Sequence, residues 1–195
     1  MATAMQAAKA RLDVSASNLA NVSTDGFHKR VARESLTAAG LVTSSTVDPS
    51  QGPLQHTGRS FDLATSGAGG FFVRDRVGRT VEARSGSFER DALGRLVDNR
   101  GNLLLGARGP LAVAADATID TRGVVREAGS IVGTVRMRPG TSIESGFLER
   151  ANVDAVGEMV DVLEAQRAFE TAQKTLSALD EARQKDVNDV VRVKS

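Results

Sequence analysis

The sequence predicts an α+β fold, with N- and C-terminal helices that pair as a coiled-coil-like core and a central small antiparallel β sandwich or barrel. Apolar residues recur at alternating three- and four-residue spacing near both ends of the chain. Short apolar runs separated by Gly- and Asp-containing turns fill the middle. Hydrophobic residues make up 41% of 195 residues, but the aromatic ones are 7 Phe, which favours small modules over one large core.

Charge and composition exclude several classes of protein. Lys and Arg total 25 and Asp and Glu total 24, so the formal net charge of +1 creates no general field for nucleic acid or an anionic membrane. The chain has no Cys, which excludes disulfides, cysteine–zinc sites and thiol nucleophiles. No apolar run approaches the roughly 20 residues of a membrane span. The first residues also lack the basic and apolar regions of a cleaved signal peptide.

The first helix is expected from Met1 to about Asn21. Because an isolated helix of about 20 residues is marginal in water, this helix needs a partner. Asp25-Gly26 signals the turn that follows, since Gly accepts positive φ. Asn18 and Asn21 share a helix face, and their amides can bond backbone groups exposed at the helix end. Phe27 is expected to anchor the chain after the turn. The seam comprises Met1, Met5, Ala8, Leu12, Ser15, Leu19 and Val22.

The middle of the chain divides into a connector and a β-rich part. Residues 35–60 are rich in Ser, Thr and Gly and show no period, which predicts an extended connector. Hairpins are then expected over residues 71–84 and 87–97. Further strands are expected near residues 103–106, 111–113, 117–120, 123–126 and 131–137. The predicted domains are a discontinuous helical core of residues 1–34 and 146–195, the connector 35–60, and a β-rich domain 61–145.

The C-terminal helix is expected from Val153 to Val193, about 60 Å long, with Asn152 as its N-cap and Asp154 in its first turn. Gly157 is a misfit, because Gly inside a helix costs about 1 kcal/mol against Ala. An apolar stripe begins with Val153, Val156, Val160 and Leu163. It continues on a slightly shifted face through Val162, Ala165, Phe169, Ala172, Leu176 and Leu179.

The patterns that carry enzyme chemistry are weak in this chain. His28 and His56 lie in expected loops without the spacing of metal ligands, and both are expected to be solvated. Residues 67–70 lack the Gly-Lys-Ser/Thr end of a phosphate loop. Turn aspartates such as Asp91 and Asp98 need no catalytic role, although the paired carboxylates of glycoside hydrolysis stay open. The sequence therefore predicts no enzyme, no catalytic site, no cofactor, no metal and no small-molecule substrate.

Three strings of residues together resemble one known family. The N-terminal string from Ser17 to Phe27 resembles the signature N-N-L-A-N-x-x-T-x-G-F of bacterial flagellar rod and hook proteins, with Ser17 in place of the first Asn. The C-terminal runs 152–154, 158–160 and 165–170 resemble the matching C-terminal signature. The ending Ala-Gln-Arg-Ala-Phe-Glu is similar to that of the proximal/distal rod subgroup. Residues 70–73, 84–88, 91–97 and 105–106 resemble that subgroup's central module.

The resemblance implies a structural axial subunit of the flagellar basal-body rod. Such subunits are exported unfolded by the type III export apparatus, without a cleaved signal peptide. They polymerise helically in the periplasm through their terminal helices and transmit torque. The implied partners are further copies of the chain, other flagellar rod and hook subunits, and the export apparatus, with no nucleic acid and no membrane span.

The chain also departs from the family pattern. It begins about one helical segment later than members usually do, so a shortened N-terminus or a misassigned start is expected. The tail after Glu181 is longer and more polar than usual. Its small central module argues against a hook protein, although a hook-type axial protein stays an alternative.

The residues expected at the assembly interface come from both ends of the chain. A different class of function, a β domain that binds or adheres from a helical stalk, also stays open. An enzyme would require carboxylates that converge in the β-rich part. The expected interface residues are Leu12, Asn18, Leu19, Asn21, Val22, Gly26, Phe27, Val153, Val156, Val160, Leu163, Gln166, Arg167, Phe169, Leu176 and Leu179.

Overall fold

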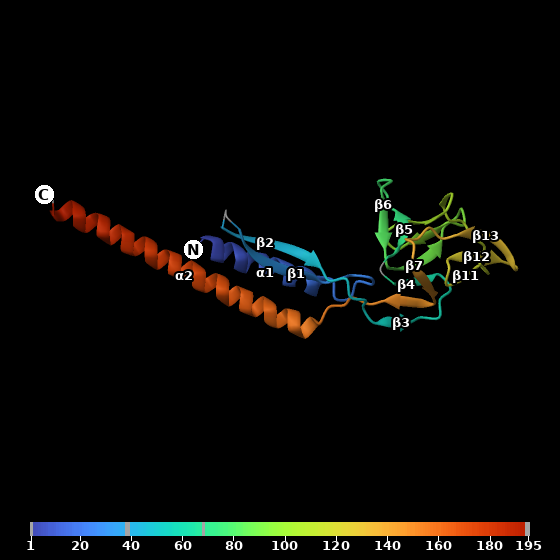
Figure 1. The fold of residues 1–195 in the computed structure, drawn as a ribbon, viewed down its shortest axis with the longest axis horizontal. Helices are drawn as coiled ribbons and strands as arrows, with labels where there is room; N and C mark the ends of the chain where they lie inside the picture. The colour runs from blue at the N-terminus through green and yellow to red at the C-terminus, as the bar shows by residue number, and fades with distance from the viewer. Residues whose placement is uncertain (1, 38–39, 68, 194–195) are drawn as a thin grey trace. The chain divides into compact units, whose positions relative to one another are not determined.

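The computed structural model describes residues 2–37, 40–67 and 69–193. Its fold is α+β, with two helices and several antiparallel sheets (Figure 1), so the predicted class is confirmed. Contacts divide the chain into two compact units. The helical unit comprises residues 1–21, 29–48 and 153–195, and the β unit comprises residues 22–28 and 49–152. Closure of the β unit into a sandwich or barrel stays a prediction.

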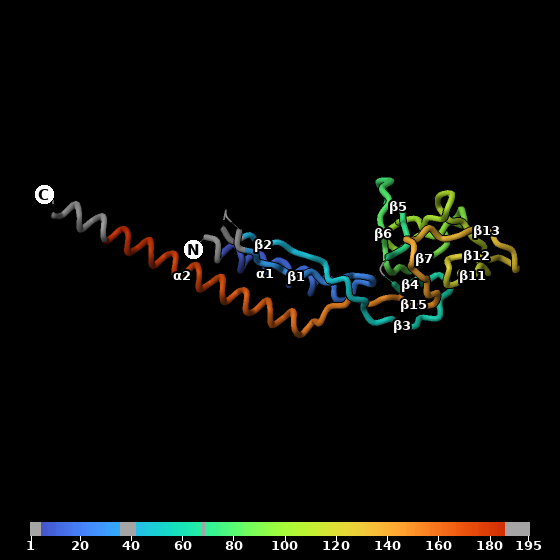
Figure 2. The backbone as a smooth tube through the Cα atoms, in the orientation of Figure 1, coloured from blue at the N-terminus to red at the C-terminus, as the bar shows by residue number. Residues whose placement is uncertain are grey.

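Helix α1 spans Ala2–Ala20 and lies beside part of the C-terminal helix, so the N- and C-terminal helices pack together in the helical unit (Figure 2). The helix ends as its sequence predicts. The Asn21 amide N–H donates to the carbonyl of Asn18 at 3.0 Å, and Asn21 Nδ2 donates to the carbonyl of Ser17 at 2.8 Å. These bonds satisfy two carbonyls that a helix C-terminus leaves free.

Helix α2 spans Ala155–Val193, two residues shorter at its start than expected. The expected cap, Asn152, instead donates from Nδ2 to the carbonyl of Ser50. Asp154 is the N-cap, because its Oδ1 accepts from the Val156 N–H at 3.1 Å. The cap also explains Gly157, since a Cβ there would lie 2.8 Å from Asp154 Oδ2. The glycine leaves room for the capping carboxylate.

The expected connector over residues 35–60 is wrong over much of its length. Strands β1 (Arg30–Thr37) and β2 (Gly40–Val47) form an antiparallel hairpin with Arg30 opposite Val47. Strand β3 (Leu54–His56) then pairs with β15 (Phe147–Glu149). The hairpin packs on α1 with one side, and its Val and Thr residues favour strands. Its many exposed polar residues hide the two-residue period on which strand prediction depends.

The β unit contains one large sheet, one smaller three-stranded sheet and the two-stranded β3–β15 sheet, and the strand pairs among its described residues are antiparallel. The large sheet has the order β14-β4-β7-β8-β9-β5-β6, with β10 paired to β9. Its strands are β4 (Asp62–Ser66), β5 (Phe71–Arg74), β6 (Thr80–Ala83), β7 (Ser85–Arg90), β8 (Leu96–Asp98), β9 (Leu103–Gly106), β10 (Gly109–Pro110) and β14 (Ser142–Ser145). The smaller sheet contains β11 (Thr118–Ile119), β12 (Val124–Glu127) and β13 (Ser130–Thr134).

Most expected strands of the β unit are present. The hairpins expected over residues 71–84 and 87–97 are β5–β6 and β7–β8, and the strand expected at 103–106 is β9. The strand expected at 111–113 is absent from the assigned elements, and Ala112 forms only an isolated bridge with Arg95. Leu111 and Val113 are nevertheless buried, so their apolar character reflects the core and not a strand.

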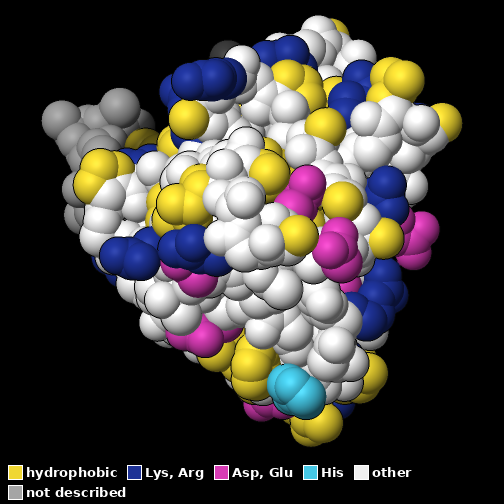
Figure 3. Space-filling view, turned by 90° about the vertical axis from the view of Figure 1, so that its right-hand side faces the viewer, with side chains coloured by type: hydrophobic (Ala, Val, Ile, Leu, Met, Phe, Trp, Pro, Cys, Tyr) yellow, Lys and Arg dark blue, Asp and Glu magenta, His cyan; other side chains and the backbone are white. Residues whose placement is uncertain are grey.

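The core of the β unit is built from Leu, Val, Ile and two edge-to-face Phe rings. The ring centroids of Phe71 and Phe88 lie 5.7 Å apart. Leu63, Leu96 and Leu104 around them are fully buried. On the face of the β unit seen in Figure 3, Arg, Asp and Glu side chains are interspersed with hydrophobic ones, so one charge sign does not dominate it.

Four tight turns of the β unit repeat one Asp-x-x-Gly design. In each, the Asp Oδ1 accepts from the N–H groups two and four residues later, at 2.8–3.0 Å. The Gly three residues later has positive φ, between 76° and 91°. The four sequences start at Asp75, Asp91, Asp98 and Asp120. These aspartates are therefore structural, as the sequence indicates.

The turn aspartates predict acid sensitivity of the β unit. A hydrogen bond from the Arg79 side chain lowers the pKa of Asp75, one from Arg95 lowers the pKa of Asp91, and the Val124 N–H lowers that of Asp120. An aspartate whose pKa is lowered in the folded state stabilises the fold at pH values above its ordinary pKa of about 3.9. This stabilisation is lost as the pH falls through the folded-state pKa. The triple variant Asp75→Asn, Asp91→Asn, Asp120→Asn keeps an oxygen acceptor in each of these turns but removes the carboxyl group that titrates.

When the pH is lowered from neutral to below about 4, we expect the Tm of the triple variant to decrease less than the Tm of the parent. Thermal unfolding measures both. Asp116→Asn is the control, because Asp116 is exposed and lies outside the four turns. Equal pH dependence of the triple variant and the parent would contradict this role.

Two leucines provide a matched test of the core. Leu104 is fully buried and Leu93 is 70% exposed. Leu104→Ala is expected to lower the free energy of unfolding by about 2–5 kcal/mol, because it leaves a cavity. Leu93→Ala is expected to stay within about 0.5 kcal/mol of the parent. Urea unfolding measures both, and similar losses for the two variants would contradict the placement of the core.

Candidate assembly site

A buried amide joins three elements of the helical unit. Asn18, only 1% exposed, accepts from the Arg30 N–H at Oδ1 and donates from Nδ2 to the Arg30 carbonyl, each at 2.8 Å. Its Nδ2 also donates to Glu158 Oε1 at 3.1 Å. Arg30 begins β1 and Glu158 lies in the first turn of α2. One side chain of α1 therefore holds both neighbours of α1 in place.

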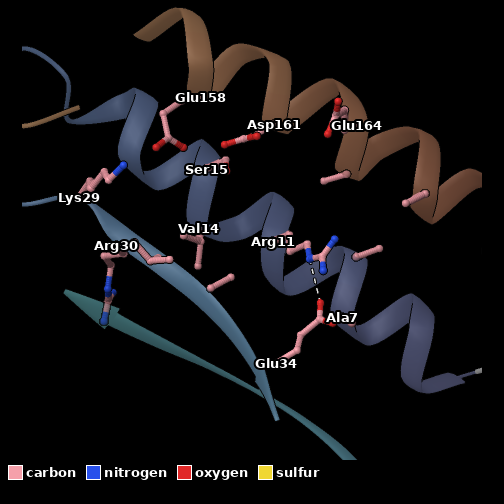
Figure 4. Close-up of a pocket in the computed structure, with 15 residues that line it drawn as sticks. Ala7, Arg11, Val14, Ser15, Lys29, Arg30, Glu34, Glu158, Asp161 and Glu164 are labelled. Atoms are coloured by element: carbon pink, nitrogen blue, oxygen red, sulfur yellow. Dashed lines mark ion pairs between the residues drawn. The ribbon is translucent and has the colours of Figure 1, made fainter. Parts of the chain in front are cut away.

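Glu158 is buried, yet it is only partly satisfied. Its Oε1 accepts from Asn18, whereas its Oε2 has no hydrogen-bond partner among the described residues. A buried carboxylate oxygen without a partner is costly. Ser15, expected as a polar break in the α1 seam, is also buried close to this acid (Figure 4).

A groove of about 730 Å³ opens over α1, and Glu158 lies in its lining. We call it the α1 groove. Residues of α1 form one side, α2 a second side, and residues 29–34 a third. Arg11 of α1 reaches Glu34 of β1 at 2.8 Å across the groove (Figure 4). The remaining lining includes the small residues Ala7, Ala8, Ala32, Ala165 and Ala168 and the acids Asp161 and Glu164.

Helix α2 carries apolar residues on two faces with different surroundings. The face that contains buried Glu158 and Ala165 continues at helical spacing through half-buried Phe169 and Leu176 and packs towards α1. The opposite face, which we call the outer face, carries Val156 (71% exposed), Val160 and Leu163 (about half exposed). The single stripe expected from the sequence is thus two stripes, and only one is covered within the helical unit.

The expected interface residues fall into these classes. Those buried or half-buried in the helical unit are Leu12, Asn18, Leu19, Asn21, Val153, Phe169 and Leu176. Those exposed on α2 are Val156, Val160, Leu163, Gln166, Arg167 and Leu179. The remaining three, Val22, Gly26 and Phe27, belong to the β unit. The N-terminal string therefore serves both units, and its interface role stays a prediction.

Gly26 and Phe27 hold the short N-terminal segment of the β unit against its C-terminal end. The Gly26 N–H donates to the Glu149 carbonyl at 2.6 Å, and the Phe27 carbonyl accepts from the Asn152 N–H at 3.3 Å. Gly26 has φ of 69°, and a Cβ there would lie 3.0 Å from the Cβ of Ser85. Conformation and space both require glycine at this position.

The expectation that His28 is a solvated loop residue is wrong. Its side chain is 10% exposed, and its Nε2 lies 3.0 Å from Oε1 of fully buried Glu149. That same oxygen accepts from the Gly52 N–H, and Oε2 lies 3.5 Å from Arg84 Nε. Sequence reasoning missed Glu149 because its partners are far apart in the chain and no motif joins them. His56, in contrast, packs edge-on against the Phe147 ring.

Comparison with known proteins supports a single family. A family model described as "Flagella basal body rod protein" matches residues 1–28, and one described as "Flagellar basal body rod FlgEFG protein C-terminal" matches residues 144–190. The chain is 32% identical to the flagellar basal-body rod protein FlgF of Escherichia coli, over 92% of this chain and 93% of that protein. The chain belongs to the flagellar basal-body rod protein family.

Further rod proteins from other bacteria agree with this assignment. The chain is 30% identical to FlgF of Salmonella typhimurium, over 92% of this chain and 93% of the relative. It is 28% identical to FlgG of Bacillus subtilis, over 91% of this chain and 92% of the relative. The alignment with the Escherichia coli protein spans 234 positions, whereas this rod protein has 195 residues. The relative therefore carries segments that this chain lacks.

Membership explains the weak catalytic patterns, because the relatives are structural rod proteins and not enzymes. Their names place this rod protein in the basal-body rod of the flagellum. Within the part of the chain that the structure describes, neither helix has the length and apolar character needed to cross a membrane.

The Asn18 junction of this rod protein yields a sharp prediction. Asn18→Ala leaves the Arg30 backbone groups and Glu158 Oε1 without their partner, so the helical unit should lose about 2–4 kcal/mol. Asn18→Asp keeps an acceptor for the Arg30 N–H but places a second carboxylate beside Glu158, so its loss should be at least as large. Denaturation followed by far-ultraviolet circular dichroism measures both.

Asn99→Ala is the control for this prediction. Asn99 is exposed in the β unit, so its replacement should stay within about 0.5 kcal/mol of the parent. Full stability of Asn18→Asp would show that the amide donors of Asn18 do not hold the helical unit together.

Proposed function

We propose that the chain is an axial subunit of the rod that polymerises helically through its terminal helices. The observation that carries this proposal is the exposed apolar stripe on the outer face of α2. Val156, Val160 and Leu163 lie together there, while the opposite face of the same helix packs towards α1. Apolar residues grouped on one exposed face mark an interaction surface.

The exposed face of α2 is available to neighbouring subunits, which we propose to be further copies and other rod subunits.

Export and torque transmission complete the proposal. The chain passes unfolded through the flagellar type III export apparatus and folds in the periplasm. The chain contains no Cys, so this folding needs no oxidation of thiols. In the rod, the helical unit forms the assembly core. Close packing of helices from successive subunits then transmits torque along the rod.

Two exposed valines test the proposal. Val160→Asp places a charge in the outer stripe of α2 and is expected to abolish assembly, because a buried unpaired carboxylate opposes association. Val77→Asp is the matched control, since Val77 is 81% exposed in a turn of the β unit. Electron microscopy and sedimentation of the purified protein with other rod subunits measure assembly, and swarming of complemented cells measures function.

Both variants should keep the parent's unfolding profile, because both sites are exposed. Normal assembly and motility of Val160→Asp would overturn the role of the outer face of α2 in rod formation.

A further inference from the structure

The α2 side of the α1 groove carries three acids. Asp161 and Glu164 form no ion pair with any described residue, and Glu158 Oε2 has no hydrogen-bond partner among them. Figure 4 shows Glu158 and Asp161 reaching from α2 towards α1. The cations in the lining are Arg11, which is paired to Glu34, Arg30 at the start of β1, and Lys29, whose side chain points towards Glu158 in Figure 4.

The unsatisfied carboxylate is the strongest sign of a ligand. Glu158 is more than nine-tenths buried and lines the groove. Because burial makes an unpaired carboxylate costly, a cationic group that enters the groove gains more there than at an exposed acid. Among the described residues, groups of three or more potential metal-binding side chains do not occur. A basic side chain therefore suits the groove better than a metal ion.

The outer face of α2 offers basic side chains of this kind. Arg167 and Lys174 are seven residues apart, so they lie on one helix face with Val160 and Leu163. Both are exposed, and neither forms an ion pair among the described residues. A helix that carries apolar residues beside cations matches a groove that has alanines beside acids.

The groove and the outer face lie on different surfaces of one helical unit. Each copy can therefore give its outer face to one neighbour and receive another neighbour in its groove. Contacts between two different surfaces are heterologous, and they propagate into open helical assemblies when they do not close into a ring.

We propose that the α1 groove binds the Arg167–Lys174 face of α2 from a second copy of this chain. Arg167 and Lys174 approach Glu158, Asp161 and Glu164, and the apolar residues beside them pack on the groove alanines. This inference rests on the proposed self-assembly of the chain and specifies which surfaces meet.

A charge-reversal experiment on the full chain tests the contact. Glu164→Lys changes the groove of one variant, and Arg167→Glu changes the outer face of another. Each variant alone should need at least about tenfold more protein for half-maximal assembly than the parent, as measured by sedimentation. Assembly of the parent should also weaken as salt is added, because the pairs lie near the surface.

Mixing the two variants in equal amounts should restore assembly. In the mixture, each groove finds an outer face of opposite charge on the other variant, so copies alternate. An effect of the substitutions on their own helix could not be repaired in this way. Asp116→Lys in the β unit is the control and should assemble like the parent, because Asp116 lies outside both surfaces.

The outcomes separate this contact from the wider function. If the parent assembles and Val160→Asp does not, but the charge variants behave like the parent, the groove contact is wrong and the axial function stands. Failure of the mixture to restore assembly also overturns the contact. If the parent does not self-associate even when concentrated, both the contact and homopolymerisation are wrong.

Discussion

The helical unit depends on the hydrogen bonds of one buried amide. The Asn18 Oδ1 accepts from the Arg30 N–H, and its Nδ2 donates to the Arg30 carbonyl and to Glu158. These bonds connect α1 to β1 and to α2. Asparagine alone among similarly shaped side chains offers an acceptor and donors together without charge. The arrangement of α1 between the hairpin and α2, and hence the α1 groove, follows from this single pattern of bonds.

The two units achieve stability in different ways. The β unit buries a continuous apolar core, and repeated aspartate turns hold its hairpins. The helical unit instead has a polar centre and alanine-rich contacts, and it leaves the outer apolar face of α2 exposed. A unit of this kind gains much of its stability only when neighbours cover its exposed face. This difference suits the assembly role that we propose for the chain.

Glu149, a buried carboxylate of the β unit, joins distant segments there as Asn18 joins elements of the helical unit. Its carboxylate accepts from the Gly52 N–H and lies against His28 and Arg84, so residues from three distant segments meet at one side chain. Paired in this way, the carboxylate is compensated, in contrast to Glu158, which keeps one oxygen without a partner. The contrast between the two acids is the physical reason to place an intermolecular contact at Glu158 and a structural role at Glu149.

The sequence by itself determined the α+β class, both helices, the β5–β6 and β7–β8 hairpins and the structural nature of the turn aspartates. These features are local, because helical spacing, capping and Asp-x-x-Gly turns are specified by residues a few positions apart. Only the tertiary structure decided the β1–β2 hairpin, the burial of His28 and the division of α2 into a covered and an outer face. His28 is buried by Glu149, which lies more than a hundred positions away along the chain. The hairpin and the two faces of α2 depend on which side of each element α1 covers. Residue spacing along the sequence does not record such contacts.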